Sequence, residues 1–387
     1  MKQNYYINVG LMAVTIMLIV SLSYVSVNIW GGSKVEVQTL TSLNYDANYT
    51  IKEFTAVNNL PDKVVMLVFD LKSVSEFNQP MNSFPVNEDK LIEKINVASA
   101  LYAESLSKDW IKIVAKFSLW FIFLTLVYFL IRKNKVGPQN RKWLYLLSFV
   151  IFGIVLGSDP SPMGTVKDAI TMYAIQNALF VPRFVALTVF LTLVVVLNKF
   201  ICSWGCQLGT LQDFIFRLNR NKQDIKGIIR QYKVPFIVSN SIRIVFFVLF
   251  TLIAFIWSFD LIGYFDPFKL FHPQVVTLAG WMFLAVILAV SMFVYRPWCH
   301  FFCPFGLVGW LFEKLSIVKI KVDYEKCVAC NACSKACPST VMDSILKQDR
   351  TIPDCFSCIN CINVCPEKAI SFSTGKRQQV PEGKFEK

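Results

Sequence analysis

Eight of the twelve cysteines of this chain lie in two short segments near its C terminus. Residues 327–338 read CVACNACSKACP, and residues 355–366 read CFSCINCINVCP. Each segment has three cysteines at C-x2-C-x2-C spacing, then a fourth after three residues with a proline directly behind it. Thiolates at such short, repeated intervals favour metal binding, because a disulfide framework needs a secreted chain much richer in cysteine. Zinc knuckles are the other alternative, although zinc sites usually need only two cysteine pairs with a longer gap.

The doubled spacing is that of the bacterial two-cluster ferredoxin run, in which the fourth cysteine of each segment binds the cluster of the other. The spacing therefore predicts two [4Fe-4S] clusters. We expect one on Cys327, Cys330, Cys333 and Cys365, and the second on Cys355, Cys358, Cys361 and Cys337. Two neighbouring clusters pass single electrons without bond chemistry by the protein, so we expect an electron-transfer component rather than a stand-alone enzyme, and no catalytic residue is assigned.

The other four cysteines form a second repeated pattern. They stand in KFICSWGCQLG, which holds Cys202 and Cys206, and in RPWCHFFCPFG, which holds Cys299 and Cys303. The two C-x3-C pairs are 97 residues apart. The same offset relates further residues, namely Lys199 to Arg296, Gly209 to Gly306 and Leu218 to Leu315. This agreement predicts an internal duplication.

Two copies inserted in the same orientation are normally related by an axis along the membrane normal. That symmetry would bring Cys202, Cys206, Cys299 and Cys303 to one depth, facing each other at the cytoplasmic surface. Four soft ligands suit iron or an iron-sulfur cluster. We favour such an additional centre over the alternative that the four are free thiols packing as small hydrophobic residues.

The rest of the chain has the composition of a membrane protein. Of its 387 residues, 55% are hydrophobic and 17% are charged, and its mean hydropathy is +0.49. Since a helix needs about 20 apolar residues to cross the hydrocarbon, we expect six spans, at residues 7–30, 111–131, 143–157, 184–201, 235–258 and 275–295. Arg243 lies within the fifth run, and we expect it to reach the nearer membrane interface or to mark the true start of that helix.

The basic residues indicate the orientation of these spans. Loop 132–142 holds five Lys or Arg residues and loop 199–233 holds seven, whereas the alternate loops 158–183 and 259–274 hold two and one. Because basic loops stay inside, both termini should be cytoplasmic. The net charge of +13 then reflects topology rather than nucleic-acid binding, since the cations gather beside apolar runs.

The predicted fold class is an α-helical integral membrane protein with a C-terminal α+β two-[4Fe-4S] ferredoxin-like domain. The outside segment should be mainly helical, because Thr50 to Glu53 forms a capping-box pattern, Pro61 suits a helix start and residues 88–107 are amphipathic. We divide the chain into an anchor helix (1–30), a small extracytoplasmic docking or packing domain (31–110), a duplicated transmembrane core (111–317), the ferredoxin domain (318–373) and a polar tail (374–387).

A multi-span core with two C-x3-C motifs and a doubled ferredoxin motif resembles the membrane polyferredoxins of the periplasmic nitrate reductase and nitrous oxide reductase systems. The resemblance covers about residues 111–372. It implies a bacterial cytoplasmic membrane and electron transfer between a quinol or cytoplasmic donor and an extracytoplasmic redox partner. The chain departs from the family in having Gln207 after Cys206, where proline is usual, and it lacks a flavin-attachment motif. Any flavin would therefore come from a partner.

Other cofactors and roles are constrained by the remaining polar residues. The chain has two histidines, His272 outside and His300 inside, which excludes a bis-histidine haem stack across the membrane.

Four polar residues on the outside loops are candidates for quinone chemistry, namely Asp159, Arg183, Asp266 and His272. Asp-Pro is also an ordinary turn signal, which is the alternative interpretation of Asp159 and Asp266.

The alternative function of the whole protein is a redox-sensing regulatory or maturation factor for a partner metalloenzyme.

Overall fold

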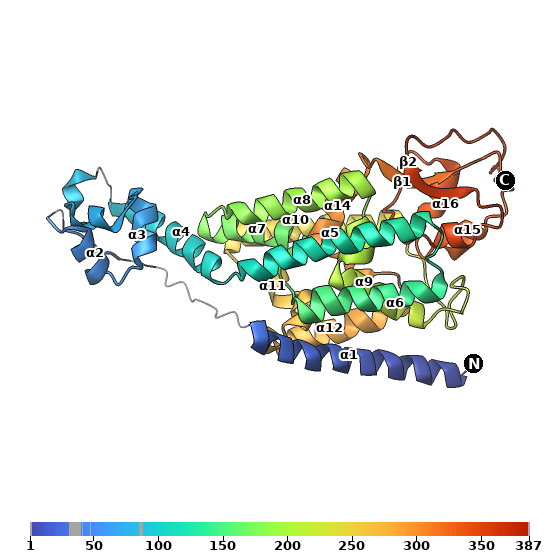
Figure 1. Cartoon of the computed structure of the whole chain (residues 1–387), viewed down its shortest axis with the longest axis horizontal. Coiled ribbons are helices and arrows are strands. Elements are labelled where there is room, and N and C mark those ends of the chain that lie inside the picture. Colours follow the sequence, from blue (N-terminus) through green and yellow to red (C-terminus); the bar gives the residue numbers. More distant parts are fainter. Residues whose placement is uncertain (1, 31–39, 41, 47, 85–87, 386–387) are drawn as a thin grey trace.

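The computed structural model describes residues 2–30, 40, 42–46, 48–84 and 88–385. The molecule is elongated (Figure 1). A small helical module occupies one end, a helical bundle runs along the long axis, and a compact domain with two strands occupies the other end.

Three helices of the bundle are long and apolar enough to cross a membrane. They are α1 (Lys2–Trp30), α5 (Trp110–Arg132) and α10 (Phe236–Trp257). Two further predicted spans form shorter apolar helices, α8 (Val181–Leu197) and α12 (Leu278–Val290). The remaining predicted span, residues 143–157, is divided between α6 (Pro138–Phe149) and the π-helix η3 (Val150–Val155). Length and composition thus identify three of the six predicted spans.

Local signals explain where several of these helices begin. The Asp109 side chain accepts a hydrogen bond from the Lys112 backbone N–H and caps α5. Thr277 caps α12 in the same way. Ser161 caps α7 (Pro162–Gln176), whose first residue is the proline that favours this position.

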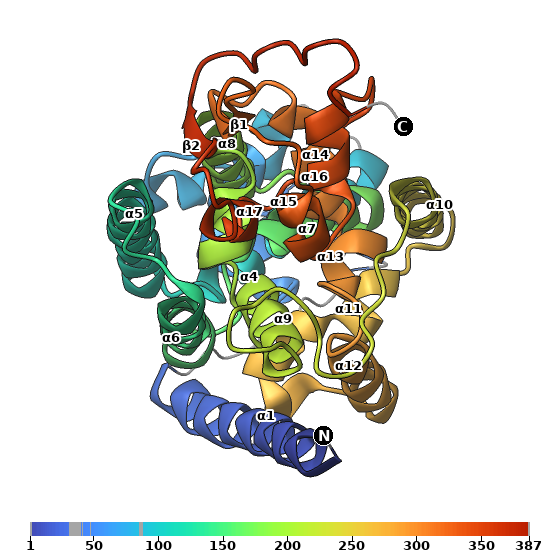
Figure 2. The same ribbon diagram turned by 90° about the vertical axis from the view of Figure 1, so that its right-hand side faces the viewer.

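Two segments turn back into the bundle. Each follows an apolar helix, α8 or α12, that ends next to the two-stranded domain. After α8, the chain forms the π-helix η4 (Ile201–Gly205) and then α9 (Gln207–Leu218). After α12, it forms α13 (Pro297–Phe301) and α14 (Pro304–Glu313). Viewed along the long axis, α9 and α13 lie inside the surrounding long helices (Figure 2). Irregular backbone is tolerated at this depth because protein surrounds it.

The C-terminal domain rests on a two-stranded antiparallel sheet, β1 (Val318–Val322) and β2 (Ile370–Thr374). Three short helices, α15 (Ala332–Ala336), α16 (Val341–Lys347) and α17 (Asn360–Asn363), connect the strands. The domain is fixed to the bundle by Phe372, whose ring centroid lies 5.8 Å from that of Phe200 and 6.1 Å from that of Tyr128.

The module at the opposite end, called the outer module, has its own core. It contains α2 (Ile51–Val57), α3 (Asp62–Phe69), the 3-10 helices η1 (Val74–Asn78) and η2 (Met81–Ser83), and α4 (Glu88–Leu106). The predicted capping box at Thr50 is present, and the helix predicted over residues 88–107 is α4. Residues 31–39, 41, 47 and 85–87 of the predicted outside domain lie outside the described residues.

Three short elements, α11 (Leu261–Phe265), η5 (Pro267–Phe271) and η6 (Pro273–Val275), join α10 to α12 at the same end as the outer module. The outer module is tied to the bundle by polar contacts. Glu104 of α4 pairs with Arg183 at 2.5 Å, and the Asn177 amide donates to the Glu93 carboxylate at 3.0 Å.

Arg243 does not mark the start of its helix, as one of the two predicted alternatives had it. It lies in the third turn of α10 and is 1% exposed. Its guanidinium pairs with the Asp354 carboxylate of the C-terminal domain at 2.5 Å. A buried carboxylate from a distant part of the sequence supplies the partner that the apolar run does not contain.

Candidate electron-transfer site

Two pockets in the C-terminal domain bring the eight motif cysteines together. The first, called the distal pocket, is lined by Cys327, Cys330, Cys333 and Cys365. The second, called the proximal pocket, is lined by Cys337, Cys355, Cys358 and Cys361. Each pocket takes three cysteines from one motif and the fourth from the other, which is the crossed arrangement of a two-cluster ferredoxin run.

The same backbone shape builds both pockets. Ala329 and Asn331 have φ of 52° and 57°, and the equivalent residues Ser357 and Ile359 have φ of 52° and 59°. Non-glycine residues rarely adopt this left-handed conformation, and it is costliest for a β-branched residue such as Ile359. Its recurrence at the same two motif positions indicates that the turns are imposed by the need to point three thiols inward.

The proximal pocket lies against the membrane bundle. Tyr295, which follows α12, forms part of its wall. The Trp204 indole N–H donates to the Ser357 carbonyl at 3.2 Å, and Arg141 of α6 donates to the Asn360 side chain at 2.8 Å. These contacts place the cysteines of the proximal pocket next to the C-x3-C segments.

Buried charges fill the interface between the bundle and the C-terminal domain. Six cations there are at most 5% exposed: Lys199, Arg141, Arg217, Arg220, Arg243 and Arg296. Three buried carboxylates pair with them: Asp213, Asp224 and Asp354. Burial also raises the pKa of Glu313 to about 8, so this acid is uncharged at neutral pH. The interface therefore holds an excess of buried positive charge.

This excess fits an anionic cluster in the proximal pocket. Within the described residues, Arg141 Nη2, Arg217 Nη2 and Arg220 Nη1 are buried and have no hydrogen-bond partner. All three arginines lie within electrostatic range of Cys358. Since a cluster held by four thiolates carries net negative charge, it would offset cations that are costly to bury alone.

The spacing of the thiols also fits a cluster better than a single ion. In the described part of the chain, no three His, Cys, Asp or Glu side chains converge closely enough to hold one metal ion. Cysteines around a [4Fe-4S] cluster bind different iron atoms, so they stand further apart than the ligands of one zinc ion.

The four cysteines of the C-x3-C motifs, called the membrane thiols, form one buried group. Cys202, Cys206, Cys299 and Cys303 are 7–8% exposed. Cys303 lies within electrostatic range of the other three. The duplication seen in the sequence therefore brings both pairs to one place.

The depth of the membrane thiols differs from the prediction. Trp120, midway along α5, donates its indole N–H to the Gly205 carbonyl at 2.8 Å. Phe302 packs against Phe246, midway along α10, with ring centroids 5.2 Å apart. The thiols thus lie halfway along the bundle rather than at its end next to the C-terminal domain, because each motif turns back between the long helices.

Helix N-termini point at two of these thiols. Cys206 precedes α9 and Cys303 precedes α14, and the Gly306 backbone N–H donates to the Cys303 sulfur at 3.4 Å. The unpaired N–H groups and dipole of a helix N-terminus favour a negatively charged thiolate. The Pro304 and Gln207 positions, which differ between the copies, both become the first residue of a helix, so the missing proline leaves this geometry intact.

Close backbone approach explains the two matched glycines. A Cβ on Gly209 would lie 2.5 Å from the Cys202 carbonyl oxygen, and one on Gly306 would lie 2.7 Å from that of Cys299. The two copies are also linked crosswise by their matched cations. Arg296 donates to the Cys202 carbonyl at 2.6 Å, and Lys199 donates to the Gly306 carbonyl at 2.9 Å.

Phe356 connects the proximal pocket to the membrane thiols. It follows Cys355 directly and lines the proximal pocket. On its other side, its ring lies 5.2 Å from the His300 ring and 4.8 Å from the Lys199 ammonium. Since His300 directly follows Cys299 in the chain, the Phe356 and His300 rings lie between the two sites. The imidazole of His300 also bonds to the Arg296 carbonyl at 3.1 Å.

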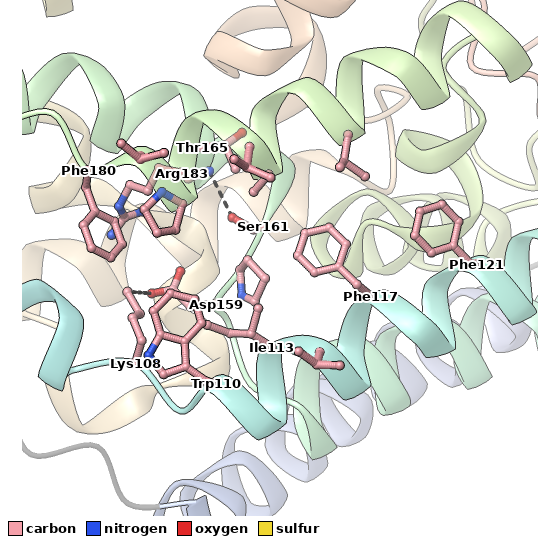
Figure 3. A pocket seen from close by; sticks show the side chains of 18 residues that line it. Lys108, Trp110, Ile113, Phe117, Phe121, Asp159, Ser161, Thr165, Phe180 and Arg183 are labelled. Carbon is pink, nitrogen blue, oxygen red and sulfur yellow. Dashed lines mark hydrogen bonds and ion pairs between the residues drawn. The ribbon is translucent and has the colours of Figure 1, made fainter.

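A cavity of about 520 Å³, called the outer pocket, lies between α5, α7 and α8 at the end near the outer module (Figure 3). Its walls are mainly apolar, and Phe117 and Phe121 extend along α5 away from its charged end. That end holds Lys108, Asp159 and Arg183, with 3.3 Å between the Lys108 ammonium and the Asp159 carboxylate. The Lys108 charge holds the pKa of the Asp159 carboxyl below its ordinary value.

The outer pocket is next to the membrane thiols. The backbone that leads to Asp159 accepts two buried hydrogen bonds, from Lys116 to the Gly157 carbonyl at 2.8 Å and from Gln207 to the Ser158 carbonyl at 2.8 Å. Gln207 directly follows Cys206. One residue therefore links a pocket wall to a thiol.

The structure brings two of the four predicted quinone candidates to this pocket. Asp159 and Arg183 line it, whereas Asp266 and His272 do not. Asp266 is joined to the same polar network through Lys167, 3.8 Å away. Sequence reasoning missed Lys108 and Lys116, although the lysines at 108, 112 and 116, which lead into an apolar run, were a signal.

Comparison with known protein families agrees with this geometry. Residues 319–366 match the 4Fe-4S dicluster domain, and residues 178–226 and 276–322 match a second family, the 4Fe-4S binding domain. The second match covers both C-x3-C motifs. The C-terminal domain is thus a two-[4Fe-4S] ferredoxin domain, as predicted.

Two of the curated relatives have names that refer to electron transport or ferredoxins. The chain is 31% identical over 206 residues to the putative electron transport protein YccM of Escherichia coli K12, covering 49% of this chain and 55% of YccM. It is 30% identical to the ferredoxin-type protein NapH of Haemophilus influenzae, covering 46% and 63%. An uncharacterised protein of Methanocaldococcus jannaschii is 26% identical, covering 67% and 94%. No solved structure gives a significant match. The chain spans about half the length of YccM, and it is similar to these ferredoxin-type proteins.

Proposed function

We propose that this iron-sulfur protein spans the bacterial cytoplasmic membrane and carries single electrons between a quinol or a cytoplasmic donor and a redox partner outside. The observation that supports this most is a row of four sites along the long axis: the distal pocket, the proximal pocket, the membrane thiols and the outer pocket. Phe356 joins the second site to the third, and Gln207 joins the third to the fourth.

The eight motif cysteines would hold the two clusters. In this proposal Cys327, Cys330, Cys333 and Cys365 bind one, and Cys337, Cys355, Cys358 and Cys361 bind the other. When bound, the clusters supply one-electron transfer without making or breaking bonds. The protein sets their surroundings: buried arginines offset the charge of the proximal thiolates, while Cys330 of the distal pocket is exposed to solvent.

Of the predicted alternatives, iron or an iron-sulfur centre, the membrane thiols would hold an iron-sulfur centre, since they do not converge closely enough for a single ion. Soft thiolates are the ligands such centres prefer. The N-termini of α9 and α14 and the buried cations Lys199 and Arg296 favour negative charge here. This site would bridge the mid-depth of the bundle, where the described residues offer no pair of histidines for haem.

The outer pocket would bind a quinol. Its apolar walls suit the ring and tail of a lipid-soluble molecule. Asp159, kept ionised by Lys108, can accept a hydrogen bond from a quinol hydroxyl, and Arg183 can hold the second oxygen. Oxidation of one quinol to a quinone releases two protons and two electrons, and the electrons would leave singly toward the membrane thiols.

The topology in this proposal has six spans, with both termini and the ferredoxin domain cytoplasmic and residues 31–110 outside. Three further segments, α6 together with η3, α8, and α12, run alongside the three long helices, which supports six crossings (Figures 1 and 2).

The outer module would dock the outside redox partner, which would be a reductase or a flavoprotein. A C-terminal alkaline phosphatase fusion should be inactive and a fusion near residue 70 active; the reverse pattern would invert the topology.

The central experiment replaces Cys202 and Cys299 by serine in the full chain. Anaerobic electron paramagnetic resonance should still detect both ferredoxin-domain clusters, whereas iron content should fall. Reduction of these clusters by a quinol analogue should become at least about 100-fold slower, since the path through mid-depth is broken.

Two outcomes would speak against the proposal. If the double variant keeps full iron and full activity, the membrane thiols are packing residues and the core is an anchor. If electron flux is absent in the unaltered protein but a partner metalloenzyme fails to mature without it, the redox-sensing or maturation role is favoured instead.

A further inference from the structure

A basic cavity lies where the bundle meets the C-terminal domain. It has a volume of about 310 Å³ and lies between the end of α9, the loop 219–233 and the end of α15. Five of its lining residues are cations: Arg220, Lys226, Arg230, Lys233 and Lys335. None of the described residues that line it is acidic. The cavity therefore attracts negative charge.

The loop that forms this cavity is held in place by side-chain hydrogen bonds. Asn219 accepts from the Ile229 backbone N–H at 2.9 Å and donates to the Met292 carbonyl at 3.0 Å. Gln231 donates to the Phe216 carbonyl at 3.1 Å. The cavity is thus formed before any partner arrives, which lowers the entropic cost of binding.

One cation of the cavity is buried with unused hydrogen-bonding capacity. Arg220 is 5% exposed, pairs with the Asp224 carboxylate at 3.2 Å and donates to the Ala336 carbonyl at 3.1 Å, but among the described residues its Nη1 atom has no hydrogen-bond partner. Lys226 and Arg230 are exposed at the rim. A buried cation at the base and exposed cations at the rim suit an anionic group that enters from solvent.

The cavity shares a wall with the proximal pocket. Cys337 lines both. Viewed from the ferredoxin end, the loop between α9 and α10 lies on the end face of the molecule rather than along the sides of the long helices (Figure 2). An occupant would therefore arrive from the aqueous side and lie against a residue of the proximal pocket.

We infer that this cavity is the docking site of an acidic one-electron carrier protein, such as a flavodoxin. Proteins that exchange electrons meet through small, weak interfaces steered by charge. In the step considered, the carrier loses one electron and the proximal site gains one, and no proton or bond is exchanged. The inference rests on the proposed electron-transfer function and adds its cytoplasmic partner.

The test uses two double variants of the full-length protein in detergent. Lys226→Glu with Arg230→Glu alters the rim of the cavity. Lys133→Glu with Lys135→Glu makes the same change of net charge on another exposed basic loop. The probe is oxidised flavodoxin, whose dissociation constant is measured by calorimetry, followed by stopped-flow reduction of the clusters by reduced flavodoxin.

The cavity variant should bind flavodoxin about 10-fold more weakly at low salt and accept electrons about 10-fold more slowly, whereas the control should change less than about 2-fold. The difference should vanish at high salt, because screening removes the steering. Equal effects in both variants, or none in either, would overturn the inference. So would a cavity variant that binds flavodoxin normally but loses retention in nanodiscs with anionic lipid, since the cavity would then hold a headgroup.

Reduction by dithionite separates this inference from the proposed function. If dithionite reduces both clusters normally while flavodoxin neither binds nor reacts, the docking site is wrong and the relay stands. If dithionite reduces no iron-sulfur signal in anaerobic protein, the relay itself is wrong.

Discussion

The distal and proximal pockets are built from one repeated motif but sit in opposite surroundings. In the distal pocket Cys330 is exposed and Val328 beside it is 61% exposed. The residue equivalent to Val328 in the proximal pocket is Phe356, which is 4% exposed and lies against His300 and Lys199. The same ligand spacing therefore serves one site at the solvent and one site inside the protein.

This difference indicates that the cysteine motif determines which cofactor binds, whereas the residues around each pocket determine the role of that cofactor. Buried cations stabilise the more negative, reduced state of a cluster, so the excess of arginine around the proximal pocket should raise its reduction potential. An electron on the distal cluster would then move toward the membrane. The order of the two sites follows from tertiary packing and not from the motif.

The largest effect should come from replacing the matched third cysteines, Cys361 and Cys333. Cys361→Ser should lower the rate of electron exchange between the membrane thiols and the C-terminal domain by more than about 100-fold, because the proximal pocket is the one in contact with the bundle. Cys333→Ser should remove the distal cluster and leave that exchange within about 3-fold. Freeze-quenched electron paramagnetic resonance measures the exchange rate in both variants. Equal decreases in rate would contradict the different roles given to the proximal and distal pockets.

A second, smaller effect should separate Phe356 from Val328. Phe356→Val opens the contact between the proximal pocket and His300, so electron exchange across it should slow by about 10-fold. Val328→Phe changes the equivalent distal residue, which faces solvent, and should leave all rates unchanged. Iron content should show that both clusters remain intact in the two variants. A loss of iron in Phe356→Val would mean that the substitution disturbs the fold rather than the electron transfer.

The reduction potentials should respond to single charges. Arg243→Gln removes a buried cation beside Asp354 and should lower the potential of the proximal cluster by roughly tens of millivolts. Lys326→Gln removes a cation beside Cys327 whose side chain is 67% exposed, and water should screen its effect to within a few millivolts. Potentiometric titration monitored by electron paramagnetic resonance tests this. A larger shift in Lys326→Gln contradicts the role given to burial.

The smallest effect concerns access to solvent. With a chelator under anaerobic conditions, the distal cluster should lose iron several-fold faster than the proximal one, since Cys330 is exposed and Cys355 and Cys361 are buried. The two losses can be followed by the decay of the separate resonance signals. Similar rates for both would mean that local opening, rather than static exposure, controls iron release.

The sequence by itself determined the parts of this protein that depend on short-range spacing. The doubled cysteine runs identify the two-cluster ferredoxin domain, because three thiols around one cluster come from a single turn-rich segment. The capping box at Thr50 and the amphipathic pattern over residues 88–107 also gave correct helices, since caps and helical periodicity are local. The offset of 97 residues predicted that Cys202 and Cys299 would come together, as they do.

Tertiary structure alone decided the depth of the membrane thiols and the partner of Arg243. Hydropathy marks apolar runs, but it does not distinguish a segment that crosses the bundle from one that turns back into it, so the thiols were expected at the surface and lie at mid-depth. Arg243 finds Asp354, which stands 111 residues later in the chain. Such a pair forms only when the C-terminal domain packs against α10, and because both groups are buried, the loss of either partner would leave an uncompensated charge.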